Sequence, residues 1–468
     1  MIKLLKVFDT NRMVKEEEKQ GDIPRYSTVA KNVMKIVWPS MLEGFLVALV
    51  TLFDGIMVSS LGNDANAGVT VTKQPIYLMI CFITALNIAL TAIISRRYGE
   101  NDQISVNKAM HEGLKLSFII SAILSIIVSC FSKEFCLLMG ATDHNIEYAT
   151  TYLRIIAAGF IFNGLRLSIN ACQRGIGKTK ISMVTNLIAN LVNIGLNYLL
   201  IEGNLGCPRL EIAGAAYATI IGNAVALGIC IITVVLPNSY LKLSIKQLIF
   251  LDKDTLKSIF HLLPSALIDQ IFLRIGFIIF AMIVNYLGDD ATYVHGICND
   301  LNSLMFTLAD GFSIGTAAVV GHRLGEKRKD LAVVYAKVSM MLSLGCAIII
   351  CLLMISVRVP LINMYKPDTE DKLLTASNIM IIAAFITFPQ NIQWVITGIL
   401  RGSGDTKFTA ITSFASVTVI RPLISYLLCY PIGLGVYGAW IGMLIDQSVR
   451  FGLNTWRFKT RKWLTIKV

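Results

Sequence analysis

Long apolar runs alternate with short polar segments along most of the chain. A helix needs about 20 predominantly apolar residues to cross a bilayer, and each of these runs is close to that length. The pattern therefore predicts an all-α integral membrane protein. We expect twelve transmembrane helices, at residues 36–60, 75–96, 114–131, 151–172, 183–201, 212–235, 259–286, 299–321, 337–358, 376–400, 408–430 and 435–454.

The composition is that of a membrane protein. Of the 468 residues, 55% are hydrophobic and only 15% are charged, whereas a soluble domain carries about 25% charged residues. Residues 1–25 contain no apolar core and no small-residue cleavage site, so we interpret them as a cytoplasmic leader rather than a signal peptide.

The net charge of +12 comes from Lys and Arg residues that lie mainly in every second loop. Basic residues concentrate in cytoplasmic loops, so this asymmetry predicts that both termini are in the cytoplasm. Because the basic residues do not gather on one soluble face, we expect no nucleic-acid partner. The expected location is the cell (plasma) membrane, crossed many times.

Signals for enzyme chemistry are weak. The ten Cys have no CxxC spacing, and most lie in apolar runs, where a free thiol behaves as a small hydrophobe. The glycine-rich loop at 175–179 lacks the GxxxxGK[ST] spacing of a phosphate-binding loop. The five His lie mostly at loops or span ends. We therefore predict a protein that is not an enzyme and has no resident cofactor.

The second half of the chain repeats the first. Four matched motifs are offset by 225 to 227 residues, and a fifth by 224. The pairs are Pro39-Ser40 with Pro264-Ser265, Leu61-Gly62-Asn63-Asp64-Ala65 with Leu287-Gly288-Asp289-Asp290-Ala291, Arg97-Tyr98-Gly99-Glu100 with Arg323-Leu324-Gly325-Glu326, loop 173–180 with loop 400–407, and Gly214-Ala215-Ala216 with Gly438-Ala439-Trp440. A duplicated unit of six helices explains this register, and an even number of spans gives both copies the same orientation.

The repeat sets the expected domain boundaries. They are a leader at 1–35, an N-lobe at 36–236 with spans one to six, a cytoplasmic linker at 237–257, a C-lobe at 258–454 with spans seven to twelve, and a cytoplasmic tail at 455–468. We expect the linker to contain a surface-lying amphipathic helix and a tether that lets the lobes move separately.

A carboxylate deep in the first span is the first candidate for chemistry. Asp54 lies about 18 residues into the apolar segment that starts at residue 36, well inside the membrane at 1.5 Å rise per residue. A charge inside a span is costly unless it faces a cavity or a partner, so such residues are usually functional. The alternative is an Asp that bonds a neighbouring Ser, Thr or Asn and only joins helices.

These motifs, in this order and duplicated, carry a family resemblance. They are FDGIMVSSLG in the first span, RRYGE and RLGE, QRGIGKTK and LRGSGDTK, and GAA and GAW. From about residue 33 to 454 the chain resembles the multidrug and toxic compound extrusion (MATE) transporters, within the multidrug/oligosaccharidyl-lipid/polysaccharide exporter superfamily. The resemblance implies two six-helix lobes around a central cavity. It also implies export of small amphipathic, often cationic compounds by alternating access, driven by a Na⁺ or H⁺ gradient.

The resemblance further implies a cation site in the N-lobe. Asp54 matches the acidic residue of the family's first span, and Thr219 matches a Thr of its sixth. Asn193 and Asn197, four residues apart on one helix face, match an Asn and an Asp of the fifth span, so Asn197 replaces a carboxylate. The remaining oxygens could hold Na⁺ at Asp54, or Asp54 could relay one proton. For Asn193 and Asn197 alone, a role in joining helices stays equally open.

In the C-lobe the positions that carry acids in other branches of the family are Phe272, or a neighbour, and Gln390. Neither is acidic, so no C-lobe Na⁺ site of that kind is expected. Gln390 and Asn163 are equivalent across the repeat, and we expect both to line the substrate cavity. Asp310, deep in the eighth span, and Arg421 complete the set of expected cavity residues, although the two could instead pair with each other.

Glu43 and Asp269 occupy equivalent positions near the cytoplasmic ends of their spans. A gating or interfacial role is one interpretation, and snorkelling to water is the other. Asp269 could pair with Arg274, although a spacing of five residues is poor geometry on one helix.

Two other functions compete with this one. A flippase for lipid-linked oligosaccharide precursors needs a strongly basic cavity to hold pyrophosphate, and only Arg166, Arg274 and Arg421 are available. A membrane enzyme needs a cluster of His, Cys or acidic residues that the pattern does not supply. The antiporter is therefore the favoured function, with small amphipathic substrates and membrane lipids as partners and a monomer as the expected state.

Overall fold

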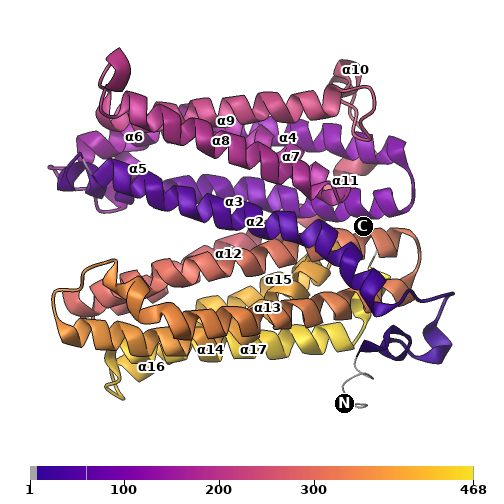
Figure 1. The fold of residues 1–468 in the computed structure, drawn as a ribbon. Helices are drawn as coiled ribbons and strands as arrows, with labels where there is room; N and C mark the ends of the chain where they lie inside the picture. The colour runs from indigo at the N-terminus through magenta and orange to yellow at the C-terminus, as the bar shows by residue number, and fades with distance from the viewer. Residues whose placement is uncertain (1–7, 60, 467–468) are drawn as a thin grey trace. The chain divides into compact units, whose positions relative to one another are not determined.

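The computed structural model describes residues 8–59 and 61–466, without the side chains at 51–56, 59, 63 and 245. Among these residues every regular element is helical, which confirms the predicted all-α fold (Figure 1). The principal helices are α2 (Tyr26–Ser59), α3 (Asn63–Gly99), α4 (Gln103–Cys130), α6 (Ile146–Ala158), α7 (Phe160–Gly175), α8 (Thr179–Leu200), α9 (Glu211–Val235), α11 (Lys253–Asn285), α12 (Asp289–Gly325), α13 (Lys329–Asn363), α14 (Glu370–Gly402), α15 (Thr406–Ser413), α16 (Arg421–Cys429) and α17 (Gly435–Lys459).

By length and composition, ten of the described helices could cross a membrane, or eleven if α6 and α7 count as one span bent by 50°. The expected eleventh span consists of α15, a seven-residue π-helix at Phe414–Ile420, and α16. The expected twelfth span is α17, which has 25 residues but buries Asp446 and Arg450 along its length. The predicted spans thus correspond to helices, several of which extend well beyond the apolar run.

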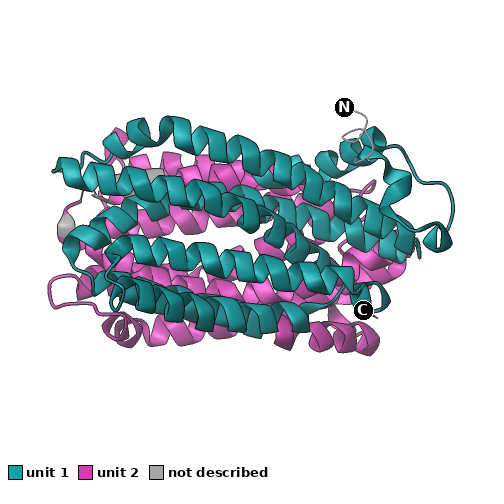
Figure 2. Cartoon of the chain, turned by 90° about the horizontal axis from the view of Figure 1, so that it is seen from below, with its two compact units in different colours: residues 1–41, 268–468 teal, residues 42–267 magenta. Residues whose placement is uncertain are grey.

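The chain forms two compact units, coloured separately in Figure 2. Unit 1 comprises Met1–Met41 and Ile268–Val468, and unit 2 comprises Leu42–Leu267. Two helices contribute to both units, because the division falls within α2 and within α11.

The internal repeat is visible in the backbone. Helices α3 and α12 have 37 residues each, and they begin after Gly62 and Gly288, whose φ angles are 107° and 105°. Such angles favour glycine because a side chain would clash with the backbone. After the same two helices, Asn101 and Lys327 adopt φ angles of 59° and 60°. Equivalent positions therefore share even their unusual conformations, as a duplicated unit requires.

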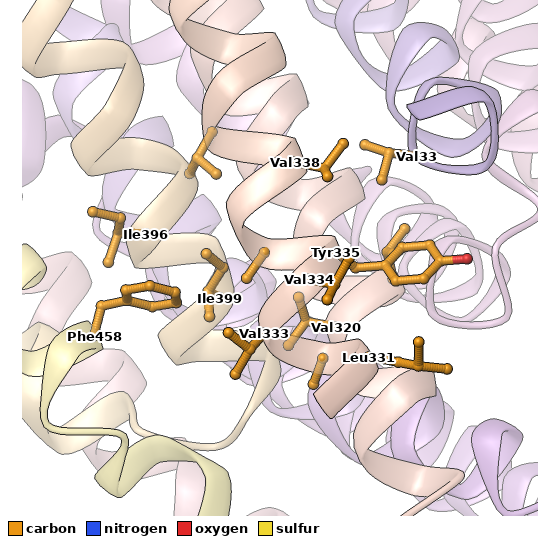
Figure 3. Close-up of a cluster of buried hydrophobic side chains, with 14 of the residues drawn as sticks. Val33, Val320, Leu331, Val333, Val334, Tyr335, Val338, Ile396, Ile399 and Phe458 are labelled. Carbon is orange, nitrogen blue, oxygen red and sulfur yellow. The ribbon is translucent and has the colours of Figure 1, made fainter. Parts of the chain in front are cut away.

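The largest apolar core lies in unit 1 and includes the beginning of α2. Val29, Val33 and Val37 are buried together with side chains of α13 and α14 (Figure 3). Helix α2 can approach α12 closely because α12 has glycine at 315, where a Cβ atom would lie 2.9 Å from the Cα of Val37. Close packing of this kind stabilises helix pairs in a membrane, where burial of apolar surface contributes little.

The leader is part of unit 1. Residues 10–18 contain two short 3₁₀ turns, and Met13 and Val14 are buried in the unit 1 core. The backbone N–H of Gln20 donates to Asp330 at 3.0 Å, and Lys337 donates to the carbonyl of Met13 at 2.6 Å. These contacts attach the leader to the beginning of α13.

The short helix α5 (Ser132–Leu138) follows α4, and α10 (Ile245–Ile249) lies in the predicted linker. The remaining short elements are 3₁₀ turns at Asn204–Gly206 and Lys462–Thr465. The linker contacts α4 at several points.

Candidate functional site

Three of the predicted site residues meet between α8 and α9 in unit 2. The Nδ2 atom of Asn193 donates to Thr219 Oγ1 at 3.2 Å, and Asn197 Nδ2 donates to Asn193 Oδ1 at 3.3 Å. Both Asn side chains are buried. Asn193 and Asn197 therefore lie on one face of α8, as predicted, and this face contacts Thr219 of α9.

Glycine on α9 makes this approach possible. A Cβ atom at Gly222 would lie 2.9 Å from the carbonyl oxygen of Ala189, and one at Gly214 would lie 2.5 Å from the carbonyl of Leu200. These two glycines, eight residues apart, lie against successive parts of α8. Small residues allow helix backbones to come close enough for short polar side chains to bond across the interface.

Asp54 lies within α2, but its side chain is outside the described part of the structure. Its helical position can still be related to the polar cluster. Val58, one turn further along α2, is packed in an apolar cluster with Ile201 and Ala215. In turn, Ile201 follows Asn197 by four residues, and Ala215 precedes Thr219 by four.

A second polar network in unit 2 is centred on Glu43. Its Oε1 atom lies 3.2 Å from Arg174 Nη1, and it also accepts hydrogen bonds from Ser182, at 3.0 Å, and from Asn186. The side chains of Glu43 and Arg174 are 11% and 12% exposed. Because this ion pair is largely buried, Glu43 does not simply snorkel to water. Arg174 belongs to the QRGIGKTK loop of the repeat.

The same network extends to a predicted cavity residue. Arg166 donates to Asn163 Oδ1 at 2.8 Å and to the carbonyl oxygen of the Asn186 amide. Asn163 thus accepts from a cation of its own helix, α7. Its amide still has donors to offer a ligand, since an Asn side chain has two N–H groups.

Unit 1 contains the equivalent arrangement. Asp269 Oδ2 lies 2.7 Å from Arg401 Nη2, and its other oxygen accepts from Ser413 at 2.5 Å. Arg401 belongs to the LRGSGDTK loop, so both copies of the repeat pair a carboxylate near the start of the first span with the Arg of the loop after the fourth. The described partner of Asp269 is therefore Arg401, from another helix, and not the Arg274 considered from the sequence.

Arg421 has a partner that the sequence reasoning did not single out. Its Nη2 and Nε atoms lie 2.5 Å and 2.9 Å from Oδ2 of Asp446, on α17. Ser416, in the π-helix, donates to the other oxygen of Asp446, and Arg450 Nη2 lies 3.7 Å from it. All three charged side chains are buried. Arg421 therefore pairs with Asp446 in unit 1, and not with Asp310 as the sequence suggested.

The other predicted cavity residues are less defined. Gln390 is buried on α14, and in the described part of the structure its Nε2 atom has no hydrogen-bond partner. Asp310 is half-buried on α12. Among the described residues, no three His, Cys, Asp or Glu side chains converge as in a metal site. A Na⁺ site at Asn193 and Asn197 would depend on Asp54.

The sequence contains a partial signal for the Glu43–Arg174 and Asp269–Arg401 ion pairs. Glu43 and Asp269 are 226 residues apart, and Arg174 and Arg401 are 227 apart, so the repeat relates both partners of both pairs. That shared offset was a usable signal. Asp446 and Arg450 also stand four residues apart inside an apolar run, a spacing that places two charges on one helix face.

Comparison with known proteins gives one consistent result. The family model described as MatE matches residues 39–199 and 264–427, one segment in each half of the chain. The two matched segments begin at the two Pro-Ser motifs of the repeat.

Similar proteins cover almost the whole chain. A protein described as probable multidrug resistance protein NorM of Thermotoga maritima is 26% identical over 93% of this chain and 93% of its own length. Multidrug resistance protein MdtK of Photorhabdus laumondii is 28% identical over 91% of this chain and 94% of its own. A solved structure of a multidrug resistance MATE family transporter in an outward-facing conformation has a TM-score of 0.87 at 19% identity, covering 94% of this chain and 97% of that one. At that identity the structural likeness shows the fold.

Proposed function

The chain belongs to the MATE family of secondary transporters, and on that basis we propose that it exports small amphipathic, often cationic compounds in exchange for Na⁺ or H⁺. The exchange uses alternating access in the cell membrane, with both termini in the cytoplasm. The coupling cation binds in unit 2, at Asp54 together with Asn193, Asn197 and Thr219.

The helical register in unit 2 carries this proposal. Val58 packs with Ile201 and Ala215. Asp54 lies one turn from Val58 on α2. One turn in the same direction leads from Ile201 to Asn197 on α8 and from Ala215 to Thr219 on α9. Residues four apart share a helix face, so position 54 belongs to the same level of the bundle as the polar cluster of α8 and α9. The register thus supports a single site that combines one carboxylate with amide and hydroxyl oxygens.

Such a site has the chemistry that coupling requires. Hard cations such as Na⁺ accept carboxylate, amide and hydroxyl oxygens as ligands. A carboxylate can also bind one proton, so the same residue could couple export to H⁺ instead of Na⁺. Exchange then follows if the cation and the exported compound prefer different conformations of the transporter, because each ligand shifts the equilibrium away from the other.

Transport by the purified protein in proteoliposomes tests the proposal. Uptake of ethidium, a fluorescent cation, is followed after imposing either a Na⁺ gradient or a pH gradient. We expect one of the two gradients to drive accumulation, and Asp54→Asn to abolish it while the variant remains folded. Asp54→Glu, which keeps the carboxylate, should retain gradient-dependent transport.

Asp64→Asn is the matched control, because this carboxylate lies at the start of α3 rather than inside α2. The control should transport as the wild type does. The coupling proposal fails if neither gradient drives transport, or if Asp54→Asn still accumulates dye under the gradient that drives the wild type.

A further inference from the structure

The predicted linker is attached to α4 rather than acting as a free tether. Along one face of α4, Asn107 Oδ1 accepts from the backbone N–H of Lys242 at 2.7 Å, and His111 Nε2 accepts from that of Ser244 at 2.9 Å. Glu112 accepts from the N–H of Asp252 at 2.9 Å. The side chains of Asn107, His111 and Glu112 are all buried. Residues 240–252 are therefore held along α4 within unit 2.

The attached linker presents bulky apolar side chains to its surroundings. Ile249, Phe250 and Leu251 are consecutive and 68% to 75% exposed. Four exposed lysines flank them in the sequence: Lys242, Lys246, Lys253 and Lys257. Exposed apolar residues flanked by lysines are the pattern of a segment that lies in a membrane interface, with its apolar side chains among the acyl chains.

Two apolar grooves lie beneath the linker. The first, of about 310 Å³, is formed by α4, α7, α9 and the linker, with Ile169, Leu227 and Leu248 among its walls. The second, of about 290 Å³, is formed by α4, the linker and the start of α11, with Ile119 and Phe260 among its walls. Both grooves are bounded by Lys115 and Phe118. They therefore diverge from one position on α4.

The grooves are continuous with apolar surface that a bilayer would cover. Phe118, Ile119 and Ile123 on α4 are each 51% exposed. In a membrane transporter, an exposed apolar face on a long spanning helix contacts lipid. The Lys115 ammonium lies where the two grooves meet, and it bonds Glu112 at 2.5 Å and the carbonyl of Phe250 at 2.7 Å. Lys108 pairs with Asp252 at 3.0 Å near the same end of α4.

We propose that these two grooves form a binding site for one anionic diacyl phospholipid of the surrounding bilayer. One acyl chain occupies each groove, and the chains separate at Phe118. The headgroup lies toward Lys115 and the exposed lysines of the linker, where the local excess of positive charge attracts an anionic lipid. Given the expected topology, this lipid belongs to the cytoplasmic leaflet. The site binds a structural lipid that holds the linker against α4, and none of its lining residues belongs to the proposed cation cluster.

Native mass spectrometry of the full-length protein in detergent tests the proposal with three defined lipids. They are palmitoyl-oleoyl phosphatidylglycerol, the phosphatidylcholine with the same two chains, and the single-chain lysophosphatidylglycerol. We expect the diacyl phosphatidylglycerol to bind with roughly tenfold lower Kd than either of the others. The comparison separates the headgroup requirement from the requirement for two chains.

Paired substitutions locate the site. Ile231 borders the first groove, whereas its neighbour Ile232 is exposed outside it. Ile119 borders the second groove, whereas Ile123, equally exposed one turn further along α4, does not. Ile231→Trp and Ile119→Trp should fill the grooves and each weaken phosphatidylglycerol binding about tenfold. The controls Ile232→Trp and Ile123→Trp should bind the lipid as the wild type does.

The outcomes are decisive in either direction. Equal binding of phosphatidylglycerol and phosphatidylcholine contradicts the anionic headgroup, and equal binding of the lyso lipid contradicts the two-chain site in favour of a groove for any single-chain amphiphile. Groove and control variants that bind equally well would show that the lipid lies elsewhere. All four tryptophan variants change apolar surface residues, so their thermal unfolding temperatures should remain close to that of the wild type.

Discussion

Arg421 and Asp446 form an ion pair in the interior of unit 1, with 2.5 Å between Nη2 and Oδ2. Their side chains are 3% and 0% exposed. Arg450 lies 3.7 Å from the same carboxylate, and in the described structure its Nε and Nη2 atoms have no hydrogen-bond partner. The cluster therefore contains one anion, Asp446, and two cations, Arg421 and Arg450. Only Arg421 bonds the anion at short distance.

Substitution of Asp446 should destabilise the protein far more than substitution of Arg450. Asp446→Asn leaves two buried guanidinium groups without an anion, and we expect a loss of about 3–5 kcal/mol in the free energy of unfolding. Arg450→Met leaves the Arg421–Asp446 pair neutral and should stay within about 1 kcal/mol of the wild type. Equilibrium unfolding in mixed micelles measures both. An Arg450→Met variant as unstable as Asp446→Asn would contradict this account of the cluster.

The Glu43–Arg174 pair should show strong coupling in a double-mutant cycle. Either Glu43→Gln or Arg174→Gln leaves one charge in a largely buried position, whereas the double variant leaves two neutral amides that can bond each other. We expect a coupling free energy of about 1–3 kcal/mol between the two positions. The same cycle at Asp269 and Arg401 should give a similar value, because the repeat preserves the pair. A coupling near zero at both sites would mean that the pairs are solvated.

Gly222→Ala should impair transport although alanine favours helix formation. The new Cβ atom would lie 2.9 Å from the carbonyl oxygen of Ala189, so α8 and α9 must separate and the 3.2 Å bond from Asn193 to Thr219 must lengthen. Gly228 is the matched control on the same helix, with nothing within 4 Å of its Cβ position. Gly228→Ala should keep transport and gain about 0.5–1 kcal/mol of stability. Dye transport and thermal unfolding distinguish the two variants.

Asn197→Asp tests the proposed cation site by adding the second carboxylate that the family resemblance implies at this position. Two anions near one site attract a cation more strongly than one. If Na⁺ is the coupling ion, we expect the half-saturating Na⁺ concentration for transport to fall roughly tenfold, which corresponds to about 1.4 kcal/mol. Asn190→Asp, about two turns earlier on α8, is the control. An unchanged Na⁺ dependence in Asn197→Asp would place the cation away from this cluster.

The contribution of the Lys108–Asp252 pair to the linker attachment should be insensitive to pH in the physiological range. The hydrogen bond from Lys108 lowers the pKa of Asp252 below its usual value. A group with a lowered folded pKa contributes stability above its unfolded pKa, and that contribution is lost as the pH falls through the folded value. The contribution is thus complete at pH 5–8 and disappears only in strong acid.

Asp252→Asn imitates the protonated carboxyl at neutral pH. We expect trypsin to cleave after the exposed Lys246 about two- to fivefold faster in this variant, as the loss of one partly exposed ion pair predicts. Asp254→Asn changes a carboxylate two residues further along the chain and outside the pair, and it should leave the cleavage rate unchanged. Equal rates in all three proteins would mean that the Lys108–Asp252 pair does not hold the linker.

The polar cluster of unit 2 was partly predictable from the sequence. The spacing of Asn193 and Asn197 placed them on one face of α8, because helix geometry depends only on local positions. Their contact with Thr219 was expected only through the family resemblance. What makes it possible is the close approach of α9 at Gly214 and Gly222, and nothing in the glycine spacing alone identified α8 as the neighbour.

The sequence by itself determined the helical class, the positions of the spans and the duplication, because apolar length, charge asymmetry and motif offset are written along the chain. Only the tertiary structure decided which charges meet. Glu43 pairs with Arg174, 131 residues away, and Asp446 pairs with Arg421 of another helix. Likewise, the linker is held by α4 through Asn107, His111 and Glu112. A buried charge must find its partner among helices that pack beside it, and that choice depends on helix packing rather than on local pattern.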